Sequence, residues 1–199
     1  MSTKTEATAE DLYRVPENAK AEIVNGKLVL MSPTGFIPGR AGGEIYVSLR
    51  DYERRTKSGY ALPDNVGFLV NLPNRRSFSP DAALYTGQPT GGKFLNGAPV
   101  FAAEVRSEND YGNAAEEEIA DKRADYFAAG TLVVWDVEVL KGSPEETPAT
   151  SLSKLKQRVV RVYRASNPKQ PQVYCQGEVA EAGPAVPSWS MPVNALFVF

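Results

Sequence analysis

Three charged residues stand in sequence contexts that favour catalytic chemistry: Asp81, Glu104 and Lys122. Asp81 follows Ser79-Pro80, and Glu104 follows the apolar run Val100-Phe101-Ala102-Ala103. Both acids are therefore expected at strand ends, whereas Lys122 lies on a later helical segment. Two carboxylates at strand ends can hold one divalent metal ion, and a nearby ammonium can orient a nucleophile or offset a developing charge.

Each of these residues has a simpler interpretation when it is considered alone. A charge that follows four apolar residues on a buried strand is costly unless it is paired or bound to a metal, but Glu104 could also mark where the strand reaches water. Asp81 follows a proline, and Ser-Pro-Asp is common turn chemistry. The combination, rather than any single residue, favours a site.

Residues 114–129 are the clearest predicted helix, with Gly130 in the position usual for a left-handed cap. At about 100° per residue, one stripe of this helix collects Ala115, Ile119, Lys122, Tyr126 and Ala129. This stripe should face the sheet, so Lys122 would point toward the core. A lysine in that position needs either a route to water or an anionic partner, and the sequence leaves both interpretations open.

The chain contains no histidine, which removes several common catalytic and metal sites. A Ser–His or Cys–His nucleophilic pair, an HEXXH zinc motif and a His₃ zinc site are all excluded. The single Cys175 likewise excludes an internal disulfide and a zinc site built from cysteines. Acid–base or metal chemistry must therefore rest on carboxylate, lysine and tyrosine side chains.

The formal net charge of −2 lacks the overall basic signature of many nucleic-acid-binding proteins. Local basic groups occur in two places, at Arg50, Arg54, Arg55 and Lys57, and at Arg75 and Arg76. Solvated helix and loop surface is the favoured interpretation for both groups, so neither predicts a nucleic-acid interface by itself.

The order of periodic segments predicts an α/β fold with a central mixed β-sheet flanked by helices and an N-terminal β-hairpin. Asn25-Gly26 predicts the hairpin turn, because both residues tolerate positive φ between two apolar runs. A helix is predicted from Arg40 to about Lys57. Strands are predicted at Tyr60–Leu62, Gly67–Leu72, Asp81–Tyr85, Val100–Val105, Thr131–Val139, Arg158–Arg164, Gln172–Tyr174 and Ala195–Phe199. The strand at 158–164 is expected to pair with the strand at 131–139.

The length of 199 residues predicts a single domain, 1–199, with a polar N-terminal arm at 1–18 and an inserted loop at 141–157. No stretch approaches the ~18 consecutive apolar residues of a membrane span. The first ten residues also lack the apolar region of a signal peptide. These features predict a cytoplasmic protein that does not contact a membrane.

From about Ala21 to Tyr163 the chain resembles the Uma2 family of endonucleases, within the PD-(D/E)XK restriction-endonuclease-like superfamily. The matching pieces are Glu22-Ile23-Val24-Asn25-Gly26-Lys27-Leu28-Val29, Met31-Ser32-Pro33-Thr34-Gly35, Pro80-Asp81, Glu104-Val105-Arg106-Ser107, Asp121-Lys122, Tyr126-Phe127-Ala128-Ala129-Gly130 and Val134-Trp135-Asp136-Val137. Each piece is short, but their collinear order is specific. The resemblance implies a restriction-endonuclease-like core.

The resemblance further implies that Asp81 and Glu104 are the metal-binding acids, with the backbone carbonyl of Val105 as a further ligand. The superfamily lysine usually lies two residues after the glutamate, where this chain has Arg106. An arginine stays protonated and is a poor substitute for a lysine beside a nucleophilic water. The resemblance therefore assigns the lysine role to Lys122 and leaves Arg106 as a residue beside the metal ligands.

Four further positions follow from the resemblance. Glu44 matches an acid on the first core helix of the superfamily and is therefore a candidate catalytic residue, although a helix-start carboxylate favoured by the dipole is an equal alternative. Glu22 is a weaker candidate, because acids on a hairpin edge usually lie on the surface, and Tyr126 is expected near the ligands. Gly42 stands where many family members have His or Asn, and the acidic run Glu116-Glu117-Glu118 precedes the helix lysine.

The resemblance implies a Mg²⁺- or Mn²⁺-dependent endonuclease that hydrolyses phosphodiester bonds of DNA, with a homodimer as the expected assembly. Carboxylate and water ligands suit these hard cations rather than zinc. The net charge, the acidic run and Gly42 favour an alternative, a catalytically inactive nuclease-fold module that binds nucleic acid or protein. Hydrolysis of a small phosphodiester or nucleotide is a third possibility.

Overall fold

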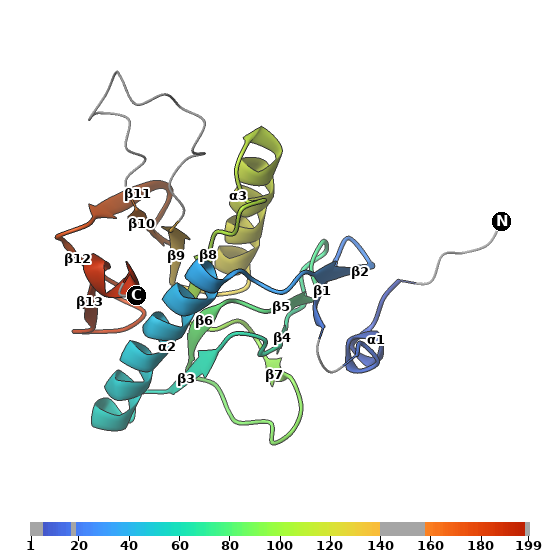
Figure 1. Ribbon diagram of the computed structural model, residues 1–199. Helices are drawn as coiled ribbons and strands as arrows, with labels where there is room; N and C mark the ends of the chain where they lie inside the picture. The colour runs from blue at the N-terminus through green and yellow to red at the C-terminus, as the bar shows by residue number, and fades with distance from the viewer. Residues whose placement is uncertain (1–5, 17–18, 140–157, 198–199) are drawn as a thin grey trace.

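A computed structural model describes residues 6–16, 19–139 and 158–197 and has an α/β fold around a six-stranded mixed sheet (Figure 1). In spatial order the strands of this sheet are β11 (Asn167–Cys175), β10 (Val159–Arg164), β9 (Val133–Glu138), β8 (Phe101–Val105), β6 (Ala82–Tyr85) and β3 (Tyr60–Pro63). The loop predicted at 141–157 lies outside the described residues, as do residues 1–5 and 17–18 of the predicted arm.

The strand directions bring the start of β6 and the end of β8 to the same edge of the sheet. Within the sheet β8 and β9 are parallel, and every other neighbouring pair is antiparallel, including the predicted pair of β9 with β10. Ala82 lies opposite Ala103, and the Asp81 amide donates to the Ala103 carbonyl at 3.0 Å. The residue before β6 is therefore a neighbour of the last residues of β8.

Helices cover the two faces of the sheet, and strand residues alternate between the faces as the pleat requires. On one face α2 (Phe36–Thr56) packs through a core that includes Ile45, Leu49, Leu84, Phe101 and Trp135. On the other face α3 (Asn113–Ala128) packs through a core that includes Tyr126, Phe78, Ala83, Ala102 and Val134. The later part of the predicted apolar stripe, at Lys122 and Tyr126, thus faces the sheet, whereas Ala115 and Ile119 are only half-buried.

The predicted N-terminal hairpin is formed by β1 (Lys20–Val24) and β2 (Lys27–Met31). Asn25 and Gly26 both have positive φ, 50° and 68°, as the turn requires. The hairpin docks on segment 74–79, where the Ile23 amide donates to Ser77 Oγ at 2.8 Å. This docking matters for the site, because segment 74–79 leads directly to Asp81.

The remaining elements are short and lie around this core. They are α1 (Ala9–Tyr13), β4 (Phe68–Leu69), β5 (Ser77–Phe78), β7 (Leu95–Asn96), β12 (Val179–Glu181), β13 (Ser190–Pro192) and the 3₁₀ helix η1 (Val193–Phe197). No helix within the described ranges is long and apolar enough to cross a membrane.

Three predicted elements differ from their predicted bounds by three residues or more. Helix α2 begins at Phe36 rather than Arg40, because Pro38 lies in its first turn, where the missing amide hydrogen of proline is tolerated. The strand predicted at 67–72 is reduced to Phe68–Leu69. The strand predicted at 172–174 extends over Asn167–Cys175, because β11 is an edge strand, where its two prolines are tolerated.

The strand predicted at 195–199 is wrong for residues 195–197, which belong to η1, and residues 198–199 lie outside the described part. Val193, Leu196 and Phe197 are buried at spacings of three and one. Alternation along a strand would place neighbouring residues on opposite faces, whereas a helical turn can bury such a set on one side.

Gly59, just before β3, is expected to tolerate no side chain. Its φ is +134°, and a Cβ there would lie 2.7 Å from the Tyr85 carbonyl oxygen on β6. Gly59→Ala should therefore lower the free energy of unfolding by about 1–3 kcal/mol, measured by urea denaturation. Gly92→Ala is the control, because its Cβ would meet nothing within 4 Å and its φ is ordinary. Equal midpoints for the two variants would contradict the prediction.

Candidate active site

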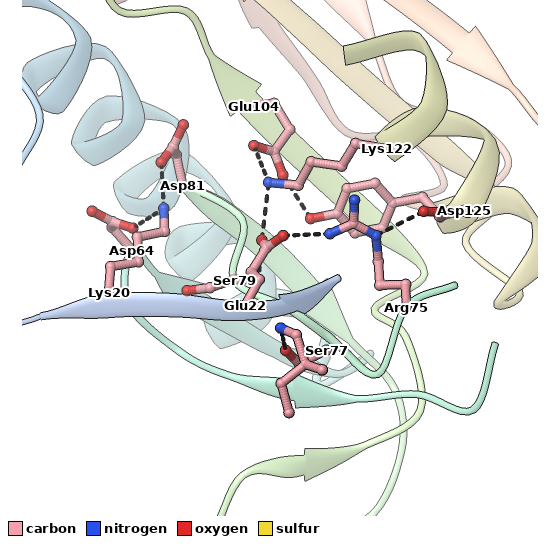
Figure 2. Close-up of polar contacts among 12 residues, drawn as sticks. Lys20, Glu22, Asp64, Arg75, Ser77, Ser79, Asp81, Glu104, Lys122 and Asp125 are labelled. Carbon is pink, nitrogen blue, oxygen red and sulfur yellow. Dashed lines mark hydrogen bonds and ion pairs between the residues drawn. The ribbon is translucent and has the colours of Figure 1, made fainter. Parts of the chain in front are cut away.

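A group of charged side chains gathers where β6 begins and β8 ends (Figure 2). We call it the acid–lysine cluster, and its members are Lys20, Glu22, Asp81, Glu104 and Lys122. Lys20 and Glu22 come from β1, and Lys122 comes from α3. The structure therefore brings the predicted trio of Asp81, Glu104 and Lys122 into one region and adds two residues from the hairpin.

Glu104 is held by two donors from α3. Its Oε2 accepts a hydrogen bond from the Lys122 ammonium at 2.9 Å, and its Oε1 accepts one from the Tyr126 hydroxyl at 2.6 Å. Burial raises the pKa of Glu104; Lys122 opposes the rise, and the Asp81 and Glu22 carboxylates add to it. Glu104 is thus a paired acid near other carboxylates, and Tyr126 lies beside it as predicted.

Lys122 pairs with two carboxylates instead of extending into solvent. Its Nζ lies 2.9 Å from Glu104 Oε2 and 3.0 Å from Glu22 Oε1, and 18% of its side chain is exposed. Burial alone would lower the pKa of Lys122, but Glu104 and Glu22 outweigh burial, and the pKa is raised. Lys122 is therefore an ammonium paired with two acids.

Asp81 is fixed from both sides. Its Oδ2 accepts a hydrogen bond from the Val105 amide at 2.8 Å, and its Oδ1 accepts one from the Lys20 ammonium at 2.9 Å. The first bond places the peptide that follows Glu104 directly beside the Asp81 carboxylate. Asp81, Glu104 and the backbone of Val105 thus border the same end of β8.

Glu22 is central to the cluster, and the expectation that it lies on the surface is wrong. Its exposed fraction is 2%. Its Oε1 accepts from the Ser79 amide at 2.9 Å and pairs with Lys122, while its Oε2 pairs with Arg75. The sequence does contain a signal for burial, because Glu22 is followed by two apolar residues on a short strand. The usual exposure of acids on hairpin edges led to the opposite expectation.

Arg75 is also buried, so its assignment to solvated surface is wrong. Its exposed fraction is 6%, and its Nε donates to Asp125 Oδ2 at 2.8 Å. The side-chain amide of Asn74 donates through Nδ2 to Asp125 Oδ1, also at 2.8 Å. Arg75 thus links Glu22 on β1 to Asp125 on α3. The neighbouring Arg76 is exposed, as predicted.

Lys20 is the cluster residue that the sequence analysis missed. Its Nζ contacts Asp81 Oδ1 at 2.9 Å and Asp64 Oδ1 at 2.7 Å, and 16% of its side chain is exposed. Lys20 and Glu22 are two residues apart on β1, so they share one face of the strand. That spacing was the available signal, and it becomes informative once Glu22 is known to be buried.

A recess of about 130 Å³ opens beside Asp81. Its lining includes Gly42 and Tyr46 on α2 and Asp64 after β3. A Cβ on Gly42 would meet the Asp81 side chain at 3.5 Å, which is ordinary contact. A histidine or asparagine at this position would therefore adjoin Asp81, and glycine leaves that space open to solvent.

Arg106 belongs to a separate ion-pair network. Its Nε donates to Asp136 Oδ1 at 2.6 Å and its Nη2 donates to Asp136 Oδ2 at 2.7 Å, while Nη1 pairs with Glu116. Among the described residues Arg106 shares no hydrogen bond or ion pair with the acid–lysine cluster. The acidic run on α3 is partly neutralised here, because its first residue is paired.

Glu44 lies on α2 and pairs with Arg40 one turn earlier, with an Nη2 to Oε1 distance of 2.7 Å. Within the described part of the chain it has no hydrogen bond or ion pair with a cluster member. The catalytic role predicted for Glu44 thus lacks a direct contact with the cluster and stays a prediction.

The donor atoms of the cluster fit a hard divalent cation. Asp81 and Glu104 offer carboxylate oxygens, and the Val105 carbonyl is an oxygen ligand of the kind that Mg²⁺ and Mn²⁺ accept. The described residues include no group of three or more acidic or cysteine side chains that could hold a metal by themselves. The protein would therefore supply part of the coordination shell and leave the rest to water and substrate.

The charge of the region also fits such an ion. Five carboxylates and three cations are linked by the ion pairs described above: Glu22, Asp64, Asp81, Glu104 and Asp125, and Lys20, Arg75 and Lys122. With all eight groups ionised, two negative charges are left uncompensated. One divalent cation would make the region neutral.

Comparisons with known proteins identify a family and a similar fold. The family model Uma2, described as "Putative restriction endonuclease", matches residues 9–194. A crystal structure described as "a putative nuclease belonging to DUF820 from Anabaena variabilis" is similar, with a TM-score of 0.67 and 15% sequence identity over 96% of this chain and 97% of that chain. At this identity the likeness supports the fold alone. No curated protein matches the chain.

Arg75 is expected to be essential for stability because two buried carboxylates depend on it. Arg75→Met should lower the free energy of unfolding by about 3 kcal/mol or more, because Glu22 and Asp125 each lose a cationic partner. The matched control is Arg76→Met at the adjacent position. It should change the free energy of unfolding by less than about 0.5 kcal/mol. Urea denaturation followed by circular dichroism measures both, and similar losses in the two variants would refute the prediction.

Proposed function

The chain belongs to the Uma2 family, and from this premise we propose that it is a metal-dependent endonuclease that hydrolyses phosphodiester bonds of DNA. One observation carries the proposal. Asp81, Glu104 and Lys122 converge at one edge of the sheet, and Asp81 lines a recess that is open to solvent. Two acids and an ammonium in this arrangement provide the parts that metal-assisted phosphodiester hydrolysis needs.

In this proposal Asp81, Glu104 and the Val105 carbonyl would hold Mg²⁺ or Mn²⁺, which supplies Lewis-acid polarisation of the phosphate and a bound water of lowered pKa. The residues around the two acids fix their orientation. The Tyr126 hydroxyl holds Glu104 Oε1, and the Val105 amide holds Asp81 Oδ2. Burial raises the pKa of Tyr126 well above its ordinary value, so its hydroxyl remains a donor.

Lys122 would act on the phosphate. An ammonium has three donors, and Glu104 and Glu22 take two of them. The third can reach a phosphate oxygen and offset the negative charge that develops during in-line attack. Cleavage of both strands of a duplex would need two such sites, so we expect a homodimer. We also expect the protein to act in the cytoplasm.

A second candidate is a nuclease-fold module that binds without cutting. The observation in its favour is that both oxygens of Asp81 and both oxygens of Glu104 already accept hydrogen bonds from protein donors. Such a cluster can be stable without a metal. Calorimetric titration with Mn²⁺ separates the two candidates, because only the enzyme requires the ion.

Asp81→Asn should abolish metal-dependent cleavage, because an amide replaces one of only two anionic ligands. The measurement is nicking of supercoiled plasmid DNA with Mn²⁺, and we expect a loss of at least about 10²-fold. Glu118→Gln is the control, since Glu118 is exposed on α3 and lies outside the cluster. Nicking at the wild-type rate by Asp81→Asn would exclude the proposed mechanism.

Tyr126→Phe tests whether the Tyr126 hydroxyl positions Glu104, in a variant that should still fold. The variant removes the hydroxyl that donates to Glu104 but keeps the ring, which stacks on Phe78 with centroids 4.0 Å apart. We expect Mn²⁺ affinity and nicking to fall about 10–100-fold, and the free energy of unfolding to fall by about 1 kcal/mol. Tyr85→Phe removes a comparable hydroxyl bond, to the Asn96 carbonyl at 2.7 Å, outside the cluster. If both variants lost nicking equally, the positioning role would be wrong.

A further inference from the structure

The ammonium of Lys20 occupies the side of Asp81 that a metal ion would need. Asp81 Oδ2 accepts a hydrogen bond from the backbone of β8, so Oδ1 is the oxygen whose partner is a flexible side chain. In this structure Oδ1 holds Lys20 Nζ at 2.9 Å. A cation that binds Asp81 through Oδ1 must therefore compete with Lys20.

The two acids are held by different lysines. Lys20 holds Asp81 from β1. Lys122 holds the other acid from α3 at the same time. The two acids thus each carry one lysine, and the two ammoniums neutralise them.

Asp64 gives Lys20 a second partner away from the acid pair. Its Oδ1 lies 2.7 Å from Lys20 Nζ and also accepts the Asn65 amide at 2.6 Å. Asp64 follows β3 and lines the same recess as Asp81, with 45% of its side chain exposed. Lys20 could therefore release Asp81 and keep one carboxylate partner, through rotation of its flexible four-carbon stem.

We propose that Lys20 is a resident cation of the acid pair, which neutralises Asp81 in the metal-free protein and withdraws to Asp64 when a divalent ion enters through the recess. This inference rests on the proposed function, because it concerns the same metal site. It adds a residue from the hairpin to that site and assigns Asp64 a role as the acceptor that keeps Lys20 nearby.

Removal of the resident charge should strengthen metal binding and weaken the metal-free fold. Lys20→Met keeps the length of the side chain and eliminates its charge, so Mn²⁺ should bind at least about tenfold more tightly in isothermal titration calorimetry. The melting temperature without metal should fall, because Asp81 and Asp64 lose their counter-charge, and saturating Mn²⁺ should raise it by more than in the wild type.

Two variants serve as controls for this experiment. Lys20→Arg keeps the positive charge, and Lys27→Met removes an exposed lysine from β2 of the same hairpin. Lys27→Met should bind Mn²⁺ with wild-type affinity, and Lys20→Arg should not bind it more tightly than the wild type. Lys20→Gln repeats the measurement if Lys20→Met fails to fold, as judged by circular dichroism.

The role of Asp64 is tested by a double-mutant cycle. Asp64→Asn alone should weaken Mn²⁺ binding, because Lys20 then has Asp81 as its remaining partner in the cluster. In the Lys20→Met background the same substitution should have little effect, since no ammonium needs a second acceptor. A full effect of Asp64→Asn in both backgrounds would show that Asp64 binds the metal directly, and would overturn its assignment.

The outcomes separate this inference from the proposed function. Tighter binding by Lys20→Met than by the wild type supports the inference, even if the wild type binds too weakly to measure. If the wild type binds Mn²⁺ and Lys20→Met binds it with equal or lower affinity, the inference is overturned. The proposed metal-dependent enzyme is unaffected by that result. The absence of binding in both proteins overturns the inference together with the metal dependence of the proposed function.

Discussion

The buried carboxylate of Glu22 is the interaction on which the rest of the site depends. It accepts the Ser79 amide and pairs with both Arg75 and Lys122. These partners come from segment 74–79, which leads to Asp81, and from α3, which holds Glu104. One carboxylate therefore ties the N-terminal hairpin, the approach to β6 and a helix on the sheet into a single arrangement. A change at Glu22 would leave two cations and an amide with fewer acceptors in a region with little water.

Such a network is better explained by positioning than by stability. The cost of removing charges from water commonly cancels the gain from pairing them, and apolar residues of similar volume can be as stable. A hydrogen-bonded network, however, admits few alternative arrangements, because each displaced partner leaves a buried group unsatisfied. We infer that the buried pairs are retained because they fix where Lys122 and Tyr126 meet Glu104. The aromatic contact of Tyr126 with Phe78 adds an apolar constraint to the same helix.

The sequence revealed the parts of the site that local patterns encode. The predicted strand ends gave the positions of Asp81 and Glu104. The helical spacing predicted that Lys122 lies on the side of α3 that faces the sheet. The hairpin contribution was underestimated, because Glu22 meets Arg75 across 53 residues and Lys20 meets Asp81 across 61. No periodicity encodes how a hairpin docks, and on a strand with mixed polarity the alternation does not say which face is buried. Strands β5 and β7 were missed for a related reason, since two residues are too few to show a period.

The distribution of arginine and lysine follows from what each cation must do. Arg106 makes two bonds to Asp136, and Arg75 is shared between Glu22 and Asp125. A planar guanidinium held by two acceptors cannot leave either one without disturbing the other. Arg106 directly follows β8 and ties the end of that strand to Asp136 on β9. Lys20 and Lys122 carry compact ammoniums on flexible stems, and they are the cations that face Asp81 and Glu104. The two arginines thus hold elements of the fold together, and the two lysines face the acid pair, where the proposed metal ion would enter.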